Sequence, residues 1–128
     1  LNFIKQLKAA DFKLAICTNK PRPLLNKILI ELSLSKYFDY CVAGGDLLTQ
    51  KPNPKNLLIC NDTLSISPEH TLLVGDSTVD QNMANSAKIK FCMFSGGYDD
   101  GVDIKSASAV ISSYQNAFKI IEDIVIAK

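Results

Sequence analysis

The sequence predicts an α/β fold in which a parallel sheet is flanked by helices. Three observations indicate this fold: short apolar runs alternate with helical segments, the apolar runs have the character of buried strands, and no tight hairpin signal joins two of them. Parallel strands need crossover connections, which are usually helices and right-handed. The chain of 128 residues has the length of one domain.

The first half of the chain begins with an amphipathic helix over residues 1–10, with one apolar stripe formed by Leu1, Ile4 and Leu7. A short apolar strand over 13–18 follows and ends in a polar turn. Pro23 suits the start of the next helix, because its missing N–H is not needed there. That helix carries its apolar stripe on Leu24, Leu25, Ile28, Leu29 and Leu32. The second strand, over 38–43, ends at a pair of glycines.

The second half continues the alternation. Residues 51–54 (KPNP) are predicted to be extended, because a residue before proline avoids the helical region. The elements expected after them are a helix with Leu57, Leu58, Asn61 and Leu64 on one side, a strand over 71–74, a helix over 79–87, strands over 90–94 and 109–111, and a last helix with Ala117, Ile120, Ile121, Ile124 and Val125 on its apolar side.

The composition excludes several classes of protein. With 47% apolar and 21% charged residues the chain is neither disordered nor a coiled coil. A net charge of +1 argues against a large nucleic-acid surface, and no apolar run approaches a membrane span. The cysteines lack C-x-x-C spacing, so we expect free, mostly buried thiols and a cytoplasmic protein; they are Cys17, Cys41, Cys60 and Cys92.

Polar residues follow the first two strands, where ligands bind in parallel sheets. Thr18 and Asn19 end the first strand, and a hydroxyl with nearby backbone N–H groups can hold a phosphate oxygen; the same pair is also typical of a plain turn. Lys51 lies in the proline-rich loop after the second strand. Its ammonium is either a solvated charge or a group that neutralises a phosphate.

Asp76 and Asp80 flank the turn between the strand over 71–74 and the next helix. Two hard oxygen ligands near a helix start suit Mg²⁺. The alternative is an acidic N-cap with a first-turn aspartate that the helix dipole favours. Taken together, a threonine, a lysine and an aspartate pair after successive strands fit phosphoryl transfer, in which positioning and charge stabilisation dominate.

Three segments resemble the second, third and fourth motifs of haloacid dehalogenase (HAD) superfamily phosphatases: ICTNKP at 16–21, KPNP at 51–54 and VGDSTVD at 74–80. The SGGY segment at 95–98 resembles a stretch of the phosphoglycolate phosphatases within that superfamily. The resemblance implies a Rossmann-like HAD core that hydrolyses a small phosphomonoester, phosphoglycolate-like, with Mg²⁺ and through an aspartyl-phosphate.

Carried onto this sequence, the resemblance implies a role for each residue. Thr18 would bind the transferring phosphoryl group, with Asn19 also at the phosphate. Lys51 would steady the nucleophile and the phosphate. Asp76 would ligate Mg²⁺, and Asp80 would support the metal through water or orient a neighbouring group.

The first motif of the family is missing. It is a D-x-D on the opening strand, followed by a small helical cap, and its first aspartate attacks phosphorus. The nearest acidic residues, Asp99, Asp100 and Asp103, have the wrong spacing and context. We therefore expect residues 1–128 to be the C-terminal portion of a HAD core that is inactive alone, because it lacks the nucleophile.

The same absence leaves a gap in the expected sheet. In the family the first-motif strand lies between the strand that ends at Thr18 and the strand that leads to Asp76. We expect these strands to close across the gap, another copy to fill it, or an N-terminal piece to remain bound.

Two residues depart from the family pattern: Val79 stands where asparagine is common, and Lys88 where glycine is usual. The alternative function is a non-catalytic phosphate- or partner-binding domain that has lost the first motif. A signalling receiver is disfavoured by site order, because its acceptor aspartate precedes the threonine and lysine. The expected partner is a small phosphorylated metabolite, without nucleic acid or membrane, and His70 is expected to be a surface residue.

Overall fold

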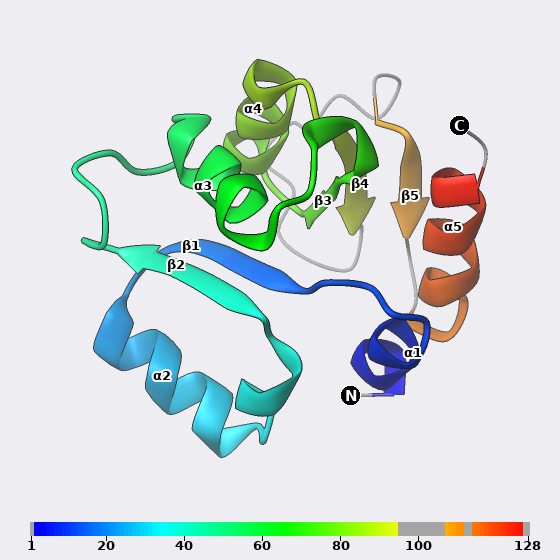
Figure 1. The fold of residues 1–128 in the computed structure, drawn as a ribbon, viewed down its shortest axis with the longest axis horizontal. Coiled ribbons are helices and arrows are strands. Elements are labelled where there is room, and N and C mark those ends of the chain that lie inside the picture. Colours follow the sequence, from blue (N-terminus) through cyan, green and yellow to red (C-terminus); the bar gives the residue numbers. More distant parts are fainter. Residues whose placement is uncertain (1, 95–106, 112–113, 127–128) are drawn as a thin grey trace.

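The computed structural model describes residues 2–94, 107–111 and 114–126, and in these ranges the strands form two parallel sheets (Figure 1). The first sheet pairs β1 (Ala15–Pro21) with β2 (Tyr40–Gly44). The second has the order β3 (Leu72–Gly75), β4 (Lys90–Phe94) and β5 (Ala109–Ile111). The predicted α/β class with parallel strands and flanking helices is confirmed.

Helices cover both faces of the sheets (Figure 1). They are α1 (Asn2–Ala9), α2 (Arg22–Glu31), α3 (Lys55–Leu64), α4 (Thr78–Ala87) and α5 (Tyr114–Ile126), with short 3₁₀ turns at Ser35–Tyr37 and Pro68–His70. α2 packs against one face of the β1–β2 sheet and α3 against the other. α3 also contacts α4, which covers β3 and β4, while α1 and α5 pack together on the opposite face beside β5.

β4 shows why its short apolar run forms a central strand. Phe91 and Met93 pack with Ala84 of α4, whereas Cys92 packs with Leu7 and Ile121 from α1 and α5. Successive side chains of a strand point to opposite faces, so a strand covered on both sides is apolar at every position. Phe91, Cys92 and Met93 are all buried.

A third apolar cluster joins the two sheets. Its buried members come from α3, α4 and the residue that precedes β4: Leu57, Met83, Ala87 and Ile89. Cys17 of β1 and Leu73 of β3 pack against this cluster from the two sheets. In the described part of the chain, helix packing therefore bridges β1 and β3 without a backbone ladder between them.

Two details differ from the sequence expectations. β1 continues to Pro21 instead of ending at Thr18, because an irregular register between Cys17 and Pro21 keeps the chain beside β2. On α2, Leu25 and Leu29 are buried, but Leu24 and Leu32 are 44% and 58% exposed. The two-stranded sheet under α2 is too narrow to cover the whole predicted stripe, and Leu32 already lies past the helix as its C-cap.

Several sequence predictions lie outside the described residues: the SGGY segment at 95–98 and the aspartates at 99, 100 and 103. All four cysteines are free, with Cys60 and Cys92 buried and Cys17 and Cys41 partly buried, as predicted. Among the helices of the described ranges, none combines the length and apolar character needed to cross a membrane.

Candidate active site

The carboxyl ends of β1 and β3 meet at Lys51. The Lys51 Nζ donates a hydrogen bond to Asp80 Oδ1 at 2.6 Å, and the two side chains are only 17% and 12% exposed. The backbone N–H of Lys51 donates to Asn19 Oδ1 at 3.0 Å. Lys51 thus connects the end of β1 to the helix that follows β3, and the sequence prediction that these residues lie together is consistent with this geometry.

Asp80 is held from both sides. Its Oδ2 accepts a hydrogen bond from Ser77 Oγ at 3.1 Å, and its backbone N–H donates to the same hydroxyl at 3.2 Å. Ser77 is therefore the N-cap of α4, so the alternative of an acidic N-cap at Asp76 is wrong, although Asp80 does lie in the first turn. With Oδ1 on Lys51 and Oδ2 on Ser77, the Asp80 carboxylate orients its neighbour Lys51.

Gly75 allows this arrangement. A Cβ at position 75 would lie 2.5 Å from Asp80 Oδ2 and 2.6 Å from Asp80 Cβ. The Asp80 side chain packs directly over the end of β3, where any residue larger than glycine would displace it. The next residue, Asp76, lines the cleft at the same end.

Thr18 and Asn19 end the regular part of β1 in a turn. Thr18 Oγ1 accepts a hydrogen bond from the backbone N–H of Lys20 at 3.1 Å. Asn19 uses its side-chain oxygen on the Lys51 backbone, so it positions the loop that carries the lysine. Contact of either residue with a phosphate stays a prediction.

A second ion pair fixes the start of that loop, and the sequence reasoning missed it. Asp46 Oδ2 pairs with Arg22 Nη2 and also accepts from the Ala43 backbone N–H at 2.9 Å. The same guanidinium donates to the Cys41 carbonyl at 2.8 Å and holds the pKa of Asp46 below its usual range. An aspartate after Gly44-Gly45 was the available signal, since Asp commonly hydrogen-bonds backbone groups in turns.

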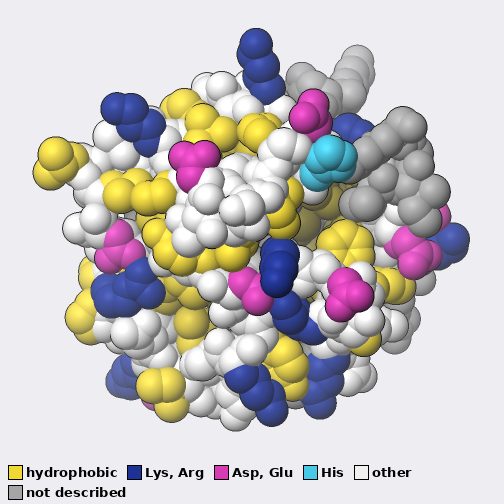
Figure 2. All heavy atoms as spheres, viewed as in Figure 1, with side chains coloured by type: hydrophobic (Ala, Val, Ile, Leu, Met, Phe, Trp, Pro, Cys, Tyr) yellow, Lys and Arg dark blue, Asp and Glu magenta, His cyan; other side chains and the backbone are white. Residues whose placement is uncertain are grey.

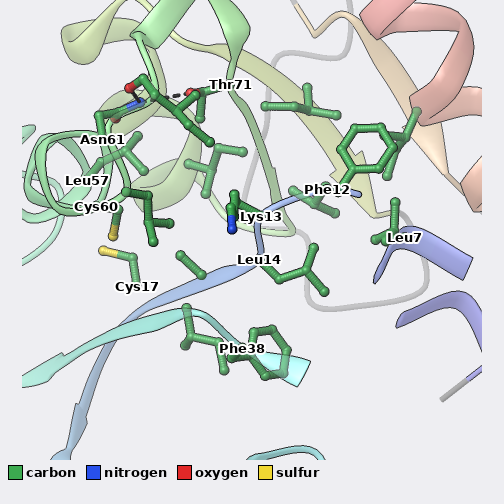
Figure 3. Close-up of a pocket in the computed structure, with 18 of the residues that line it drawn as sticks. Leu7, Phe12, Lys13, Leu14, Cys17, Phe38, Leu57, Cys60, Asn61 and Thr71 are labelled. Atoms are coloured by element: carbon green, nitrogen blue, oxygen red, sulfur yellow. Dashed lines mark hydrogen bonds between the residues drawn. The ribbon is translucent and has the colours of Figure 1, made fainter. Parts of the chain in front are cut away.

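A cleft of about 1190 Å³ separates β1 from β3. Lys51, Asp76 and Asp80 line one end of it, and Ser67 and His70 line the other. The walls between are mostly apolar, with side chains that converge from β1, α3 and the segment before β1 (Figure 3). Figure 2 shows hydrophobic side chains in the recess beside the histidine. His70 is exposed, as predicted, and its Nδ1 lies 2.6 Å from Ser67 Oγ.

The cleft lies where the sequence predicted a gap. β1 is paired only with β2 and β3 only with β4 in the described part of the chain, so the two strands have not closed across it. Val74 of β3 is 40% exposed there, which is unusual for a strand in the middle of an α/β domain.

The residues present fit a divalent metal only in part. Mg²⁺ takes one or two protein carboxylates and keeps several waters, and Asp76 at the end of β3 is a suitable carboxylate. Asp80 is turned toward Lys51 and Ser77 instead. Within residues 2–94, 107–111 and 114–126, no three His, Cys, Asp or Glu side chains gather around a common metal position.

Residues 1–94, which include Asn19, Lys51, Asp76 and Asp80, match the family described as haloacid dehalogenase-like hydrolase. The chain belongs to this HAD family. The predicted resemblance is confirmed, and the HAD motifs at 16–21, 51–54 and 74–80 are the segments that meet at Lys51.

Phosphoglycolate phosphatases are among the relatives of this HAD chain. Over 101 residues the chain is 34% identical to the phosphoglycolate phosphatase from Nitrosococcus oceani. The aligned region covers 79% of this chain and 45% of that protein. Identity to the one from Psychrobacter arcticus is 38% over 102 residues, or 80% of this chain and 44% of the relative. The chain thus spans less than half the length of these curated relatives.

Solved structures show the same fold. A predicted phosphoglycolate phosphatase from Haemophilus somnus superposes with a TM-score of 0.86 at 26% identity, over 94% of this chain and 54% of that one. A HAD-superfamily hydrolase from Geobacter sulfurreducens superposes with a TM-score of 0.81 over 93% of this chain and 57% of that one; at 24% identity it supports the fold alone.

Proposed function

We propose that this chain is the phosphate- and metal-binding part of a Mg²⁺-dependent phosphatase that hydrolyses a small phosphomonoester, phosphoglycolate-like. The observation that carries the proposal is Lys51, held at the end of the cleft by Asn19 and Asp80. A lysine whose backbone N–H is bound by Asn19 and whose ammonium is bound by Asp80 is preorganised to stabilise charge on a phosphoryl group. Phosphoglycolate phosphatases among the relatives support the substrate class.

Each residue has a distinct task in this proposal. Thr18 binds the transferring phosphoryl group through its hydroxyl and the turn that follows β1. Lys51 neutralises charge on the phosphate and the nucleophile, while Asn19 and Asp80 position it. Asp76 is the carboxylate that would hold Mg²⁺, whose charge, when the ion is bound, offsets that of the phosphate.

The proposal places the nucleophile outside residues 1–128. An aspartate is required for an aspartyl-phosphate, and Asp80 already pairs with Lys51 while Asp76 is assigned to the metal. We place this reaction in the cytoplasm, because four unpaired cysteines suit a reducing compartment.

The proposal also places a strand in the cleft. β1 and β3 have their carboxyl ends together at Lys51, so one strand parallel to both could pair with the edge of each that has no partner within the described ranges. Its side chains would cover the exposed Val74 and the apolar cleft walls. An aspartate at its carboxyl end would then face Lys51. We propose that this strand comes from sequence outside residues 1–128 rather than from a second copy.

Turnover by the longest reading frame that contains residues 1–128 tests the activity. Its hydrolysis of phosphoglycolate and a panel of sugar and acid phosphates is measured with Mg²⁺ and with EDTA. We expect Mg²⁺-dependent turnover that falls at least ~100-fold in Lys51→Met, as for loss of one transition-state charge partner. Lys55→Met is the matched control, since Lys55 is an exposed lysine at the start of α3. Phosphate binding without any turnover would instead favour the non-catalytic alternative.

Peptide binding tests the strand separately from the chemistry. The probe is a labelled, soluble peptide with a central Val-Ile-Val-Ile segment, and the control peptide has the same side chains but N-methylated central amides that cannot donate to a strand edge. We expect only the first to bind residues 1–128. Val74→Lys should abolish binding, whereas Val110→Lys should not, because Val110 is equally exposed at 38% but lies on β5 away from the cleft.

Two results would contradict the strand proposal. Equal binding of the two peptides would show that backbone pairing is not involved. Reversible dimers of residues 1–128 that dissociate in Val74→Lys would show that a second copy fills the cleft.

A further inference from the structure

Three sulfur atoms gather where β1, α3 and α4 meet. The Cys17 Sγ lies 3.9 Å from Met83 Sδ and donates to the Asn56 carbonyl at 3.3 Å. The Cys60 Sγ lies 3.9 Å from the same carbonyl oxygen. Figure 3 shows the Cys17 and Cys60 side chains pointing toward one another from β1 and α3.

This sulfur cluster (Cys17, Cys60 and Met83) has apolar surroundings, and the protein encloses it on the side away from the cleft. Cys60 is 6% exposed and Met83 is fully buried, in contact with the apolar cluster of α3 and α4. Cys17 is only partly buried, and both cysteines line the cleft, which gives a small ion a route to them. The phosphate chemistry proposed above uses none of these three side chains.

We propose that the sulfur cluster binds one soft monovalent metal ion, Cu(I). Thiolate and thioether ligands select Cu(I), whereas Mg²⁺ prefers the oxygens found at the other side of Lys51. A metal–sulfur bond of roughly 2.3 Å in a trigonal plane separates the sulfurs by roughly 4 Å. The observed 3.9 Å between Cys17 Sγ and Met83 Sδ matches that spacing for this pair of sulfurs.

Binding is an exchange of protons for the metal and involves no oxidation. Cu(I) replaces the proton of each thiol, so two S–H bonds break, two Cu–S bonds form, two protons leave, and Met83 adds a neutral donor. The resulting unit carries one negative charge, and the paired Lys51 ammonium and Asp80 carboxylate nearby act on Cys17 in opposite directions.

Protonation makes the binding depend on pH. Burial raises the pKa of Cys17 to about 11, with Lys51 lowering and Asp80 raising it, and burial with the neighbouring Cys17 and Cys41 raises the pKa of Cys60 to about 12. Both thiols are protonated at neutral pH, so each ion must release two protons. The apparent affinity should therefore rise about 100-fold for each pH unit between pH 6 and 8.

Anaerobic titration of the reduced chain with Cu(I), supplied as its acetonitrile complex and competed by a colorimetric Cu(I) chelator, tests the site. We expect one ion per chain, two protons released and an ultraviolet thiolate-to-Cu(I) band. Cys17→Ser and Cys60→Ser should each weaken binding at least ~100-fold, and Met83→Leu about 10-fold. Cys92→Ser is the matched control, because Cys92 is a buried thiol with its pKa also raised to about 11 but lies in a different cluster.

Three results would overturn the assignment of a Cu(I) site. Binding that persists in both Cys17→Ser and Cys60→Ser, or that is lost equally in Cys92→Ser, would overturn the assignment. The assignment would also be overturned if the wild-type chain, shown by circular dichroism to be folded, did not compete with the chelator for Cu(I). The titration contains no phosphate ester, so its result is independent of the proposed phosphatase activity.

Discussion

Asp80→Asn is the sharpest perturbation of the site, because it removes one charge and keeps the shape of the side chain. In the native chain the Asp80 carboxylate is bonded to Lys51 at 2.6 Å, and both side chains are more than four-fifths buried. The substitution leaves the Lys51 ammonium buried beside a neutral amide. Removing one partner of a fully buried pair costs about 3–5 kcal/mol, and the residual exposure here reduces that to about 2–3 kcal/mol.

A double variant that also replaces Lys51 provides the internal control. In Lys51→Met/Asp80→Asn no charge is left without its partner, and a long apolar side chain occupies the place of the lysine stem. Replacing both members of a buried pair is often nearly neutral. We therefore expect the double variant to lose about 2 kcal/mol less than the sum of the single variants, a coupling within the range for contacting residues.

Urea unfolding followed by circular dichroism measures the four free energies of unfolding. An equal urea dependence of the free energy among the variants checks that the unfolded states are comparable. Additivity within about 0.5 kcal/mol would refute the view that Asp80 acts by holding Lys51.

Three further predictions concern stability. Gly44→Ala should lower the free energy of unfolding in urea by about 3 kcal/mol, since the added Cβ would lie 2.8 Å from the carbonyl carbon of Asn19. Gly45→Ala should lower it by only about 1 kcal/mol, because Gly45 has φ +90° but no atom near the position of the added Cβ. Equal losses in the two variants would contradict the steric argument. Lys88→Gly should raise stability by about 1 kcal/mol, because Lys88 ends α4 at φ 59°, whereas Lys88→Ala should give no gain in the same assay. The hydrogen bond from Lys8 lowers the pKa of Asp39. Because this pair is exposed to solvent, its stabilisation should be only about 0.5 kcal/mol, present above about pH 4 and lost as pH falls through the lowered pKa. Asp39→Asn should remove this pH dependence of unfolding, and an unchanged profile would contradict it.

The sequence was a good guide to the elements that local patterns determine. The strand over 90–94 was predicted at its observed bounds, because the four positions after the exposed Lys90 are apolar and both faces are covered. The strand at 109–111 also matches its predicted bounds. The ends of β1 were predicted less well, since its extension to Pro21 depends on where β2 lies beside it.

The candidate site was predictable in its members but not in its contacts. Asn19, Lys51 and Asp76 were expected after successive strands, so their placement at one end of the cleft follows from parallel topology. The pairing of Asp80 with Lys51 depends on Gly75 leaving room for the carboxylate, and the grip of Asn19 on the Lys51 backbone depends on loop geometry. Neither has a period or motif that a sequence pattern could reveal.

The role of Lys88 links a sequence departure to a structural cost. The resemblance to the HAD family implies glycine at that position, and the residue that ends α4 has a left-handed backbone with φ 59° and ψ 41°, which favours glycine. A lysine there tolerates a conformation that glycine adopts freely.

We infer that residues 1–128 belong to a HAD core whose sheet is completed in the cleft between β1 and β3. Backbone hydrogen exchange at 15–17 and 72–74 measures this directly, in residues 1–128 alone and in the longest reading frame that contains them. We expect amides of these edges to exchange at least ~100-fold more slowly in the longer protein and those of β4 to change little, because only the cleft edges gain a partner strand. Equal exchange at the two edges in both proteins would contradict it.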